Sequence, residues 1–70
     1  MKKGQSAEIL EILDCIYKDK LMEMGCVPGV TIVMTMKAPF GDPLGYDLEG
    51  YTLSMRKSEA SNVVVKLLAD

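Results

Sequence analysis

The sequence has no histidine and no tryptophan, a single phenylalanine and a single arginine. Without histidine it lacks the commonest general base of enzymes and the commonest ligand of transition metals. The segment GDPLG is not a phosphate-binding loop, because it lacks the lysine and the following serine or threonine of a P-loop. We therefore expect no catalytic residue and interpret the chain as something other than an enzyme.

Long apolar runs are also missing. No stretch of about 18 apolar residues occurs, so we expect no membrane-spanning helix and no direct insertion into a membrane. Glu8 and Glu11 interrupt the N-terminal segment, which argues against a signal peptide and makes the cytoplasm the expected location. The formal net charge is −2 and the lysines are scattered, so the chain lacks the basic footprint of a nucleic-acid-binding protein.

Cysteine is scarce, with only Cys15 and Cys26. Without an export signal we expect two reduced thiols that pack as small apolar side chains. The ten acidic residues are spread along the chain, and most of the six methionines fall at core spacing. Metal sites need several histidine, cysteine or carboxylate ligands close together. We therefore expect no metal site and no cofactor.

One helix is predicted over residues 15–24. Asp14 is expected to cap its first turn by accepting a backbone N–H. Gly25 is expected to end it, because glycine reaches the left-handed conformation at little cost. The face expected to turn towards a core has apolar residues at i, i+4 and i+7, namely Tyr17, Leu21 and Met24.

Strand patterns occupy most of the remaining chain. The clearest is residues 30–36, where Val30, Ile32, Met34 and Met36 are expected to share one face. Further strands are expected at residues 7–13, 44–49, 51–56 and 63–68. Glu49-Gly50 joins two of them as a tight hairpin turn, and Ser58 is expected to cap a short helical turn. The pattern predicts a mainly β fold, a small five-stranded barrel whose closure removes exposed edges.

The loop between the second and third strands, residues 38–43, carries the single phenylalanine. Pro39 and Pro43 stiffen the loop, and Gly41 allows a positive φ. Phe40 at its tip either plugs the end of the barrel or stays exposed to meet a partner. We hypothesise a partner-binding surface at this end of the barrel, formed by Lys37, Phe40, Asp42, Leu44, Arg56 and Lys57.

Within this set, Phe40 and Leu44 are the expected apolar anchors, and the charged residues are the expected rim. Arg56 has two interpretations. It holds a loop in place through carbonyl groups or Asp42, or it acts in trans as an arginine finger on a GTPase. Its position at a strand end beside a tight turn favours the first.

Two segments resemble a known family. Residues 21–29, LMEMGCVPG, resemble the leucine-x-x-(leucine or methionine)-glycine-x-x-x-glycine element of FeoA, the small cytosolic component of bacterial ferrous iron transport. Residues 37–65 resemble the rest of that domain, from the glycine-aspartate-proline loop through the arginine and the glutamate-alanine pair to a valine-rich strand. Met55 stands where leucine is more usual. The resemblance implies an SH3-like barrel with one helical insertion, and we expect residues 1–70 to form this one domain.

The resemblance also implies a role. FeoA-like proteins are associated with FeoB, a membrane protein with a cytosolic GTPase domain. The implied function is a non-enzymatic accessory protein that binds and modulates FeoB, placed peripherally at the inner face of the membrane through this partner. The chain has no winged helix and no membrane segment, so we expect neither a repressor nor a fusion. A homo-oligomer stays open, as does a peptide- or ligand-binding regulatory barrel with no transport role.

Overall fold

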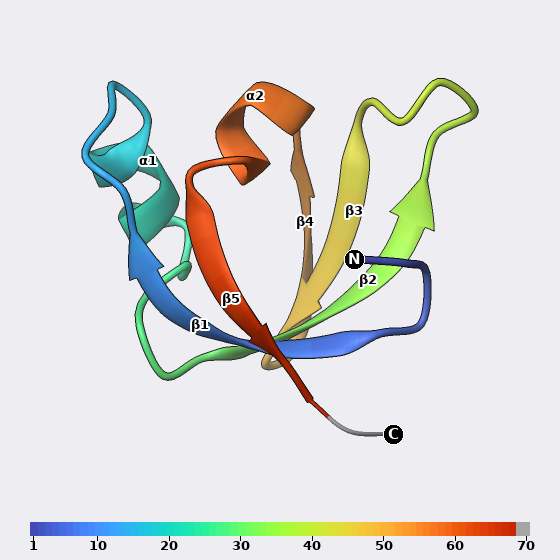
Figure 1. Cartoon of the computed structure of the whole chain (residues 1–70), viewed down its shortest axis with the longest axis horizontal. Coiled ribbons are helices and arrows are strands. Elements are labelled where there is room, and N and C mark those ends of the chain that lie inside the picture. The colour runs from blue at the N-terminus through green and yellow to red at the C-terminus, as the bar shows by residue number, and fades with distance from the viewer. Residues whose placement is uncertain (69–70) are drawn as a thin grey trace.

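The computed structural model describes residues 1–68, so Ala69 and Asp70 of the predicted domain lie outside the described residues. It consists of one curved antiparallel sheet of five strands in the order β4-β3-β2-β1-β5, with two short helices (Figure 1). This confirms the predicted mainly β fold. The elements are β1 (Ser6–Ile12), α1 (Lys18–Glu23), β2 (Thr31–Lys37), β3 (Leu44–Leu48), β4 (Tyr51–Met55), α2 (Lys57–Ala60) and β5 (Val63–Leu67).

Strand β2 follows its predicted alternation only in part. Ile32 and Met34 are each 2% exposed and face the core. The register between β2 and β3 shifts between Met34 and Met36, and Met36 is 44% exposed. A bulge of this kind puts an extra residue into one strand and turns the following side chains. The prediction that Met36 shares the buried face is therefore wrong.

The hairpin of β3 and β4 is confirmed. Leu48 pairs with Tyr51 across the Glu49-Gly50 turn, and Gly50 has a φ of 103°. A positive φ at the second position of a turn is a conformation that glycine adopts at little steric cost. The hairpin holds Leu44 opposite Met55 at its open end.

Helix α1 is shorter than predicted and is not capped by Asp14. Its N-cap is Tyr17, which makes no side-chain capping hydrogen bond. A separate turn, in which the Lys18 amide donates to the Cys15 carbonyl over 3.2 Å, lies between Asp14 and the helix. The Asp14 carboxylate instead accepts a hydrogen bond from Lys18 Nζ at 3.1 Å. Neither helix of the described chain is long and apolar enough to cross a membrane.

The end of α1 confirms the predicted role of Gly25, which has a φ of 99°. The Cys26 amide donates to the Leu21 carbonyl at 3.0 Å, and the Gly25 amide donates to the Met22 carbonyl at 3.1 Å. These two bonds form a Schellman motif. Leu21 and Cys26 are both 0% exposed, so the apolar stripe of α1 and the residue after its end pack in the core.

Helix α2 begins at Lys57 with Arg56 as its N-cap, so the prediction that Ser58 caps it is wrong. The Arg56 amide donates to Glu59 Oε1 at 2.9 Å, and Lys20 Nζ donates to Glu59 Oε2 at 3.0 Å. These two hydrogen bonds hold the pKa of Glu59 below its usual range, the Arg56 amide first. Glu59 is 9% exposed and links α2 to α1.

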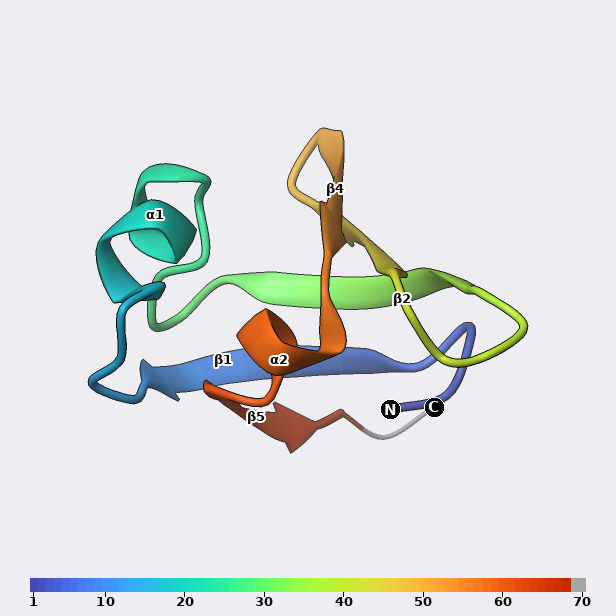
Figure 2. The same cartoon turned by 90° about the horizontal axis from the view of Figure 1, so that it is seen from above.

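The sheet curls around the core but does not close. Among residues 1–68, β4 pairs only with β3, and β5 pairs only with β1. Both views place α2 between β4 and β5 (Figures 1 and 2). The prediction that closure removes the sheet edges is therefore wrong, because the chain crosses from β4 to β5 through α2 without pairing the two strands.

Candidate functional site

The loop of residues 38–43 folds as a compact turn with an apolar tip. The Gly41 amide donates to the Ala38 carbonyl at 2.7 Å, and the Ala38 amide donates to the Pro43 carbonyl at 3.2 Å. Gly41 has a φ of 80°, which completes the turn. Phe40 is 95% exposed. Phe40 is therefore exposed at the tip of the loop and does not plug the end of the barrel.

Asp42 attaches this loop to the junction of β4 and α2. Its Oδ1 accepts a hydrogen bond from the Lys57 amide at 2.8 Å. Its Oδ2 lies 3.9 Å from Arg56 Nη1, in an ion pair in which the Arg56 side chain is 76% exposed. An exposed pair at this distance contributes little stability. The Lys57 amide bond is therefore the stronger of the two attachments.

Two lysines lie beside the turn. A Cβ added to Gly41 would lie 3.5 Å from Lys57 Nζ and 4.0 Å from Lys37 Cε. With Arg56, which pairs with Asp42, these lysines bring three cationic side chains to the 38–43 loop. The end of the barrel is therefore locally positive, although the whole chain has a net charge of −2. Such a patch attracts an acidic surface and accelerates encounter with it.

Leu44 has a different position from the other residues of the predicted set. It is 7% exposed and packs in the core, where it lies opposite Lys37 of β2 and Met55 of β4. A buried side chain cannot anchor a partner, so Leu44 supports the loop from below. We define the loop-end surface as the remaining residues of the set, Lys37, Phe40, Asp42, Arg56 and Lys57.

The thiols and carboxylates do not form a reactive site in the described part of the chain. No group of three or more histidine, cysteine, aspartate or glutamate side chains within residues 1–68 is arranged to hold a metal ion. Cys26 is 0% exposed, and its burial raises the pKa of the thiol. Cys15 is only partly buried. A buried, protonated thiol is inert as a nucleophile, so Cys26 behaves as the predicted core residue.

Helix α1 and the 38–43 loop lie at opposite ends of the molecule (Figures 1 and 2). The turn before α1 carries Ile16, which is 89% exposed. On the same side, the Tyr51 hydroxyl donates a hydrogen bond to the Met24 carbonyl at the end of α1. The sequence pattern identified neither feature, since a turn residue and a bond across 27 positions leave no local periodicity.

Comparison with known proteins gives a consistent result. A model of the FeoA domain matches residues 1–67. A FeoA-like protein from Clostridium acetobutylicum has a solved structure with a TM-score of 0.93 and 37% identity, over 100% of this chain and 83% of that one. FeoA of Stenotrophomonas maltophilia, solved with zinc, has a TM-score of 0.83 and 30% identity over 94% of this chain and 84% of that one. The latter is described as a prokaryotic SH3 domain protein, in agreement with the predicted SH3-like fold.

A curated relative is much larger. A fusion of Fe(2+) transport protein A with the Fe(2+) transporter FeoB, from Porphyromonas gingivalis, is 33% identical over 54 residues. The match covers 77% of this chain and 6% of the fusion protein. In that relative, a segment similar to this chain is therefore covalently joined to a FeoB transporter.

Proposed function

The chain belongs to the FeoA family, and on that premise we propose that it is a non-enzymatic accessory protein of ferrous iron transport that binds a FeoB-type transporter through its loop-end surface. The observation that carries this proposal is Phe40, 95% exposed on a loop held by internal hydrogen bonds and by Asp42. An exposed aromatic side chain on a rigid support is typical of an interface anchor.

The fusion relative supports the choice of partner. When two proteins occur joined in one chain, the local concentration of each for the other is high, and a modest interface is enough to hold them together. The S. maltophilia relative is described as a candidate activating factor of ferrous iron transport. Together they favour modulation of a transporter over an independent regulatory role.

The structure of the loop-end surface suits a transient interface. The turn at residues 38–41 and the bond from the Lys57 amide to Asp42 fix the loop before binding, so little conformational entropy is lost on association. The lysines around Phe40 direct the domain towards an acidic surface of the transporter. Binding should therefore weaken as salt increases, because exposed charges are screened over about 10 Å at 0.1 M.

Location follows from the partner in this proposal. The domain works at the cytosolic face of the membrane, held there by the transporter. The domain binds FeoB, and the iron passes through the transporter without binding to this chain.

Membrane binding tests the proposal against the regulatory alternative. Membranes that contain the FeoB-type transporter and membranes without it are incubated with the labelled chain, with and without guanine nucleotide, at two salt concentrations. We expect retention only with the transporter, weaker at high salt. Equal retention on both membranes, or none on either, would favour the peptide- or ligand-binding barrel with no transport role.

A further inference from the structure

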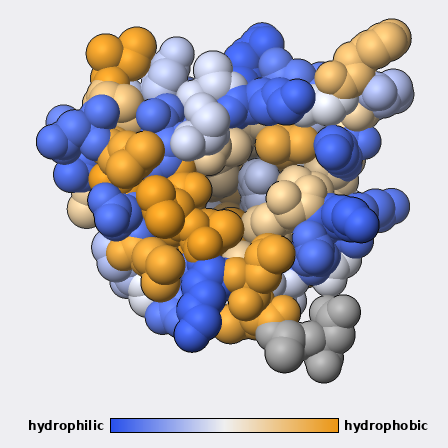
Figure 3. All heavy atoms as spheres, in the orientation of Figure 1, coloured by the Kyte–Doolittle hydropathy of each residue, from blue (hydrophilic) through white to orange (hydrophobic). Residues whose placement is uncertain are grey.

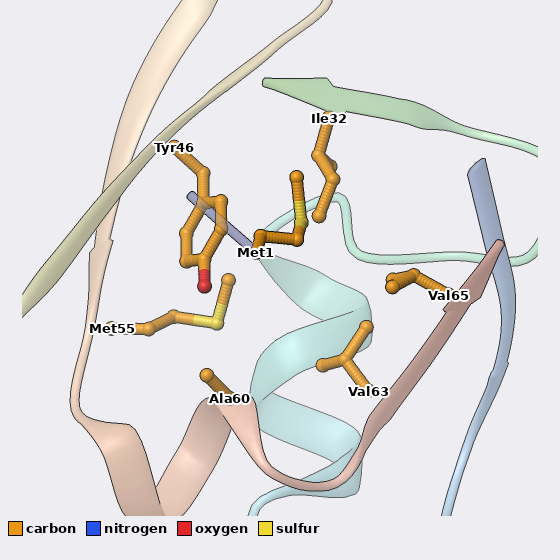
Figure 4. A pocket seen from close by; sticks show the side chains of 7 residues that line it. All are labelled: Met1, Ile32, Tyr46, Met55, Ala60, Val63 and Val65. Atoms are coloured by element: carbon orange, nitrogen blue, oxygen red, sulfur yellow. The ribbon is translucent and has the colours of Figure 1, made fainter. Parts of the chain in front are cut away.

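A hollow of about 120 Å³ opens between the unpaired edges of β4 and β5. It is separate from the loop-end surface. Its lining is apolar apart from one tyrosine hydroxyl, and its walls come from β2, β3, β4, α2, β5 and the first residue (Figure 4). The lining residues are Met1, Ile32, Tyr46, Met55, Ala60, Val63 and Val65.

The edge of β5 beside this hollow is free. The Leu68 amide donates to the Ser6 carbonyl at 2.9 Å, and the Leu13 amide donates to the Asn62 carbonyl at 2.8 Å. Since backbone groups alternate in direction along an antiparallel strand, the N–H and C=O groups of Val63, Val65 and Leu67 point away from β1. Within residues 1–68 no strand pairs with them.

The surface around this edge is apolar. Figure 3 shows hydrophobic side chains gathered along β5 and β1 on the viewed face. Leu67 is 53% exposed and Leu10 is 49% exposed. A free, apolar edge strand is a template for the addition of another strand. In such complexes main-chain hydrogen bonds provide affinity and a side-chain pocket provides specificity.

Met1 forms one wall of the hollow. It lies against Ile32 and Tyr46 and is only partly buried (Figure 4). The backbone reaches this position through a turn in which Gly4 has a φ of 89° and its amide donates to the Met34 carbonyl at 2.7 Å. Methionine is unbranched and adapts to irregular apolar spaces. With an adaptable wall and an apolar lining, the hollow fits a flexible aliphatic side chain.

The charges nearby favour an acidic ligand. Lys2 and Lys3 are exposed and directly follow the residue in the hollow. Lys66 is exposed on β5, where Glu8 of β1 lies opposite it. Among the salt bridges of residues 1–68, none includes Lys2, Lys3 or Lys66. Carboxylates that flank an added strand would meet these cations.

We propose that a partner protein's extended segment adds as a sixth strand along the free edge of β5 and inserts one methionine or leucine side chain into the hollow. Acidic residues flank that side chain in the partner. Met1 lines the hollow in the free protein, and its side chain moves aside on binding. This site is independent of the loop-end surface, so either can exist without the other.

A peptide titration followed by NMR tests this site. The probe is the acetylated, amidated peptide EVTMTVE, which places valine, methionine and valine on one face of a strand and glutamates on the other. We expect shifts at the methyl groups of Ile32, Val63 and Val65, with the Met1 methyl signal moving to the position of an exposed methionine. The matched peptide EVTSTVE should bind at least about tenfold more weakly, because it lacks the inserted side chain.

Variants of the protein sharpen the test. Ala60→Leu, which fills the hollow, should weaken the peptide at least tenfold, whereas Phe40→Ala should leave its affinity unchanged. If Ala60→Leu lowers the melting temperature, Val65→Thr is used in its place. This substitution keeps the β-branched shape and puts a polar hydroxyl into the apolar lining.

Three results would overturn the proposal. The first is equal binding of the methionine and serine peptides. The second is unchanged affinity in the folded Ala60→Leu or Val65→Thr variant. The third is a set of shifts that maps to the loop-end surface instead of to β5.

Discussion

Gly25→Ala should destabilise the domain more than an alanine substitution at a turn glycine that has open space around it, because Gly25 is crowded by Tyr51. At Gly25 the backbone has a φ of 99°, which costs an L-residue about 1–2 kcal/mol. A Cβ there would also clash with the Tyr51 hydroxyl and lie 3.1 Å from Tyr51 Cζ. To make room, the ring must leave the Met24 carbonyl, a hydrogen bond that contributes about 0.5–1.5 kcal/mol.

Gly29→Ala is the matched control. Gly29 has a φ of 94°, so the backbone penalty is nearly the same, but no atom lies within 4 Å of an added Cβ. We expect Gly25→Ala to cost about 1 kcal/mol more than Gly29→Ala. In a domain of this size that difference is about 4–8 °C in melting temperature, measured by circular dichroism. Gly25→Val should be worse still, since a β-branched residue tolerates this conformation poorly.

A double-mutant cycle identifies the cause. In a Tyr51→Phe background the hydroxyl is gone, so the extra cost of Gly25→Ala over Gly29→Ala should shrink. Equal melting temperatures for the two alanine variants in the wild-type background would refute the reasoning. That result would mean that Tyr51 does not hold the end of α1.

Three further predictions concern the core, acid stability and iron. Leu21→Ala should lower the free energy of unfolding by about 2–5 kcal/mol, seen in urea titration, because Leu21 is 0% exposed. Folding lowers the pKa of Glu59, so the stability that this carboxylate contributes is complete above its unfolded pKa and is lost as the pH falls through its folded pKa. The difference in stability between wild type and Glu59→Gln should therefore vanish in acid. A difference that stays constant down to pH 2 would contradict this prediction. Anaerobic calorimetry with Fe(II) should give no binding isotherm, and a micromolar isotherm abolished by Cys15→Ser or Cys26→Ser would contradict the absence of an iron site.

Local rules were sufficient for most of the fold. The alternation of β2 as far as Met34, the Glu49-Gly50 turn and the end of α1 at Gly25 depend on neighbouring residues, and all three are present. The errors occurred where another interaction, either a neighbouring turn or a distant strand, replaces the expected one. Asp14 lost its capping role because a turn intervenes, and Met36 turned outward because β2 meets β3 through a bulge.

The sequence likewise indicated some features of the candidate site and missed others. The composition of the 38–43 loop indicated a stiff turn, but its exposure depends on the whole barrel, and the sequence left both alternatives open for Phe40. The attachment of Asp42 to the Lys57 amide joins positions 15 residues apart, and no periodicity reports it. The hollow that Met1 lines forms only after β4 and β5 are brought near each other without pairing.

The affinity of the Phe40→Ala variant for a purified FeoB-type transporter tests the central claim most directly. Ile16→Ala is the control, because Ile16 is 89% exposed in the turn before α1, and α1 lies at the opposite end of the molecule from the 38–43 loop (Figure 2). Phe40→Ala should weaken binding by about 1–2 kcal/mol at an unchanged melting temperature, as expected for an aromatic anchor, and Ile16→Ala should bind as tightly as wild type. Unchanged affinity for Phe40→Ala, or an equal loss for both variants, would contradict binding through the loop-end surface.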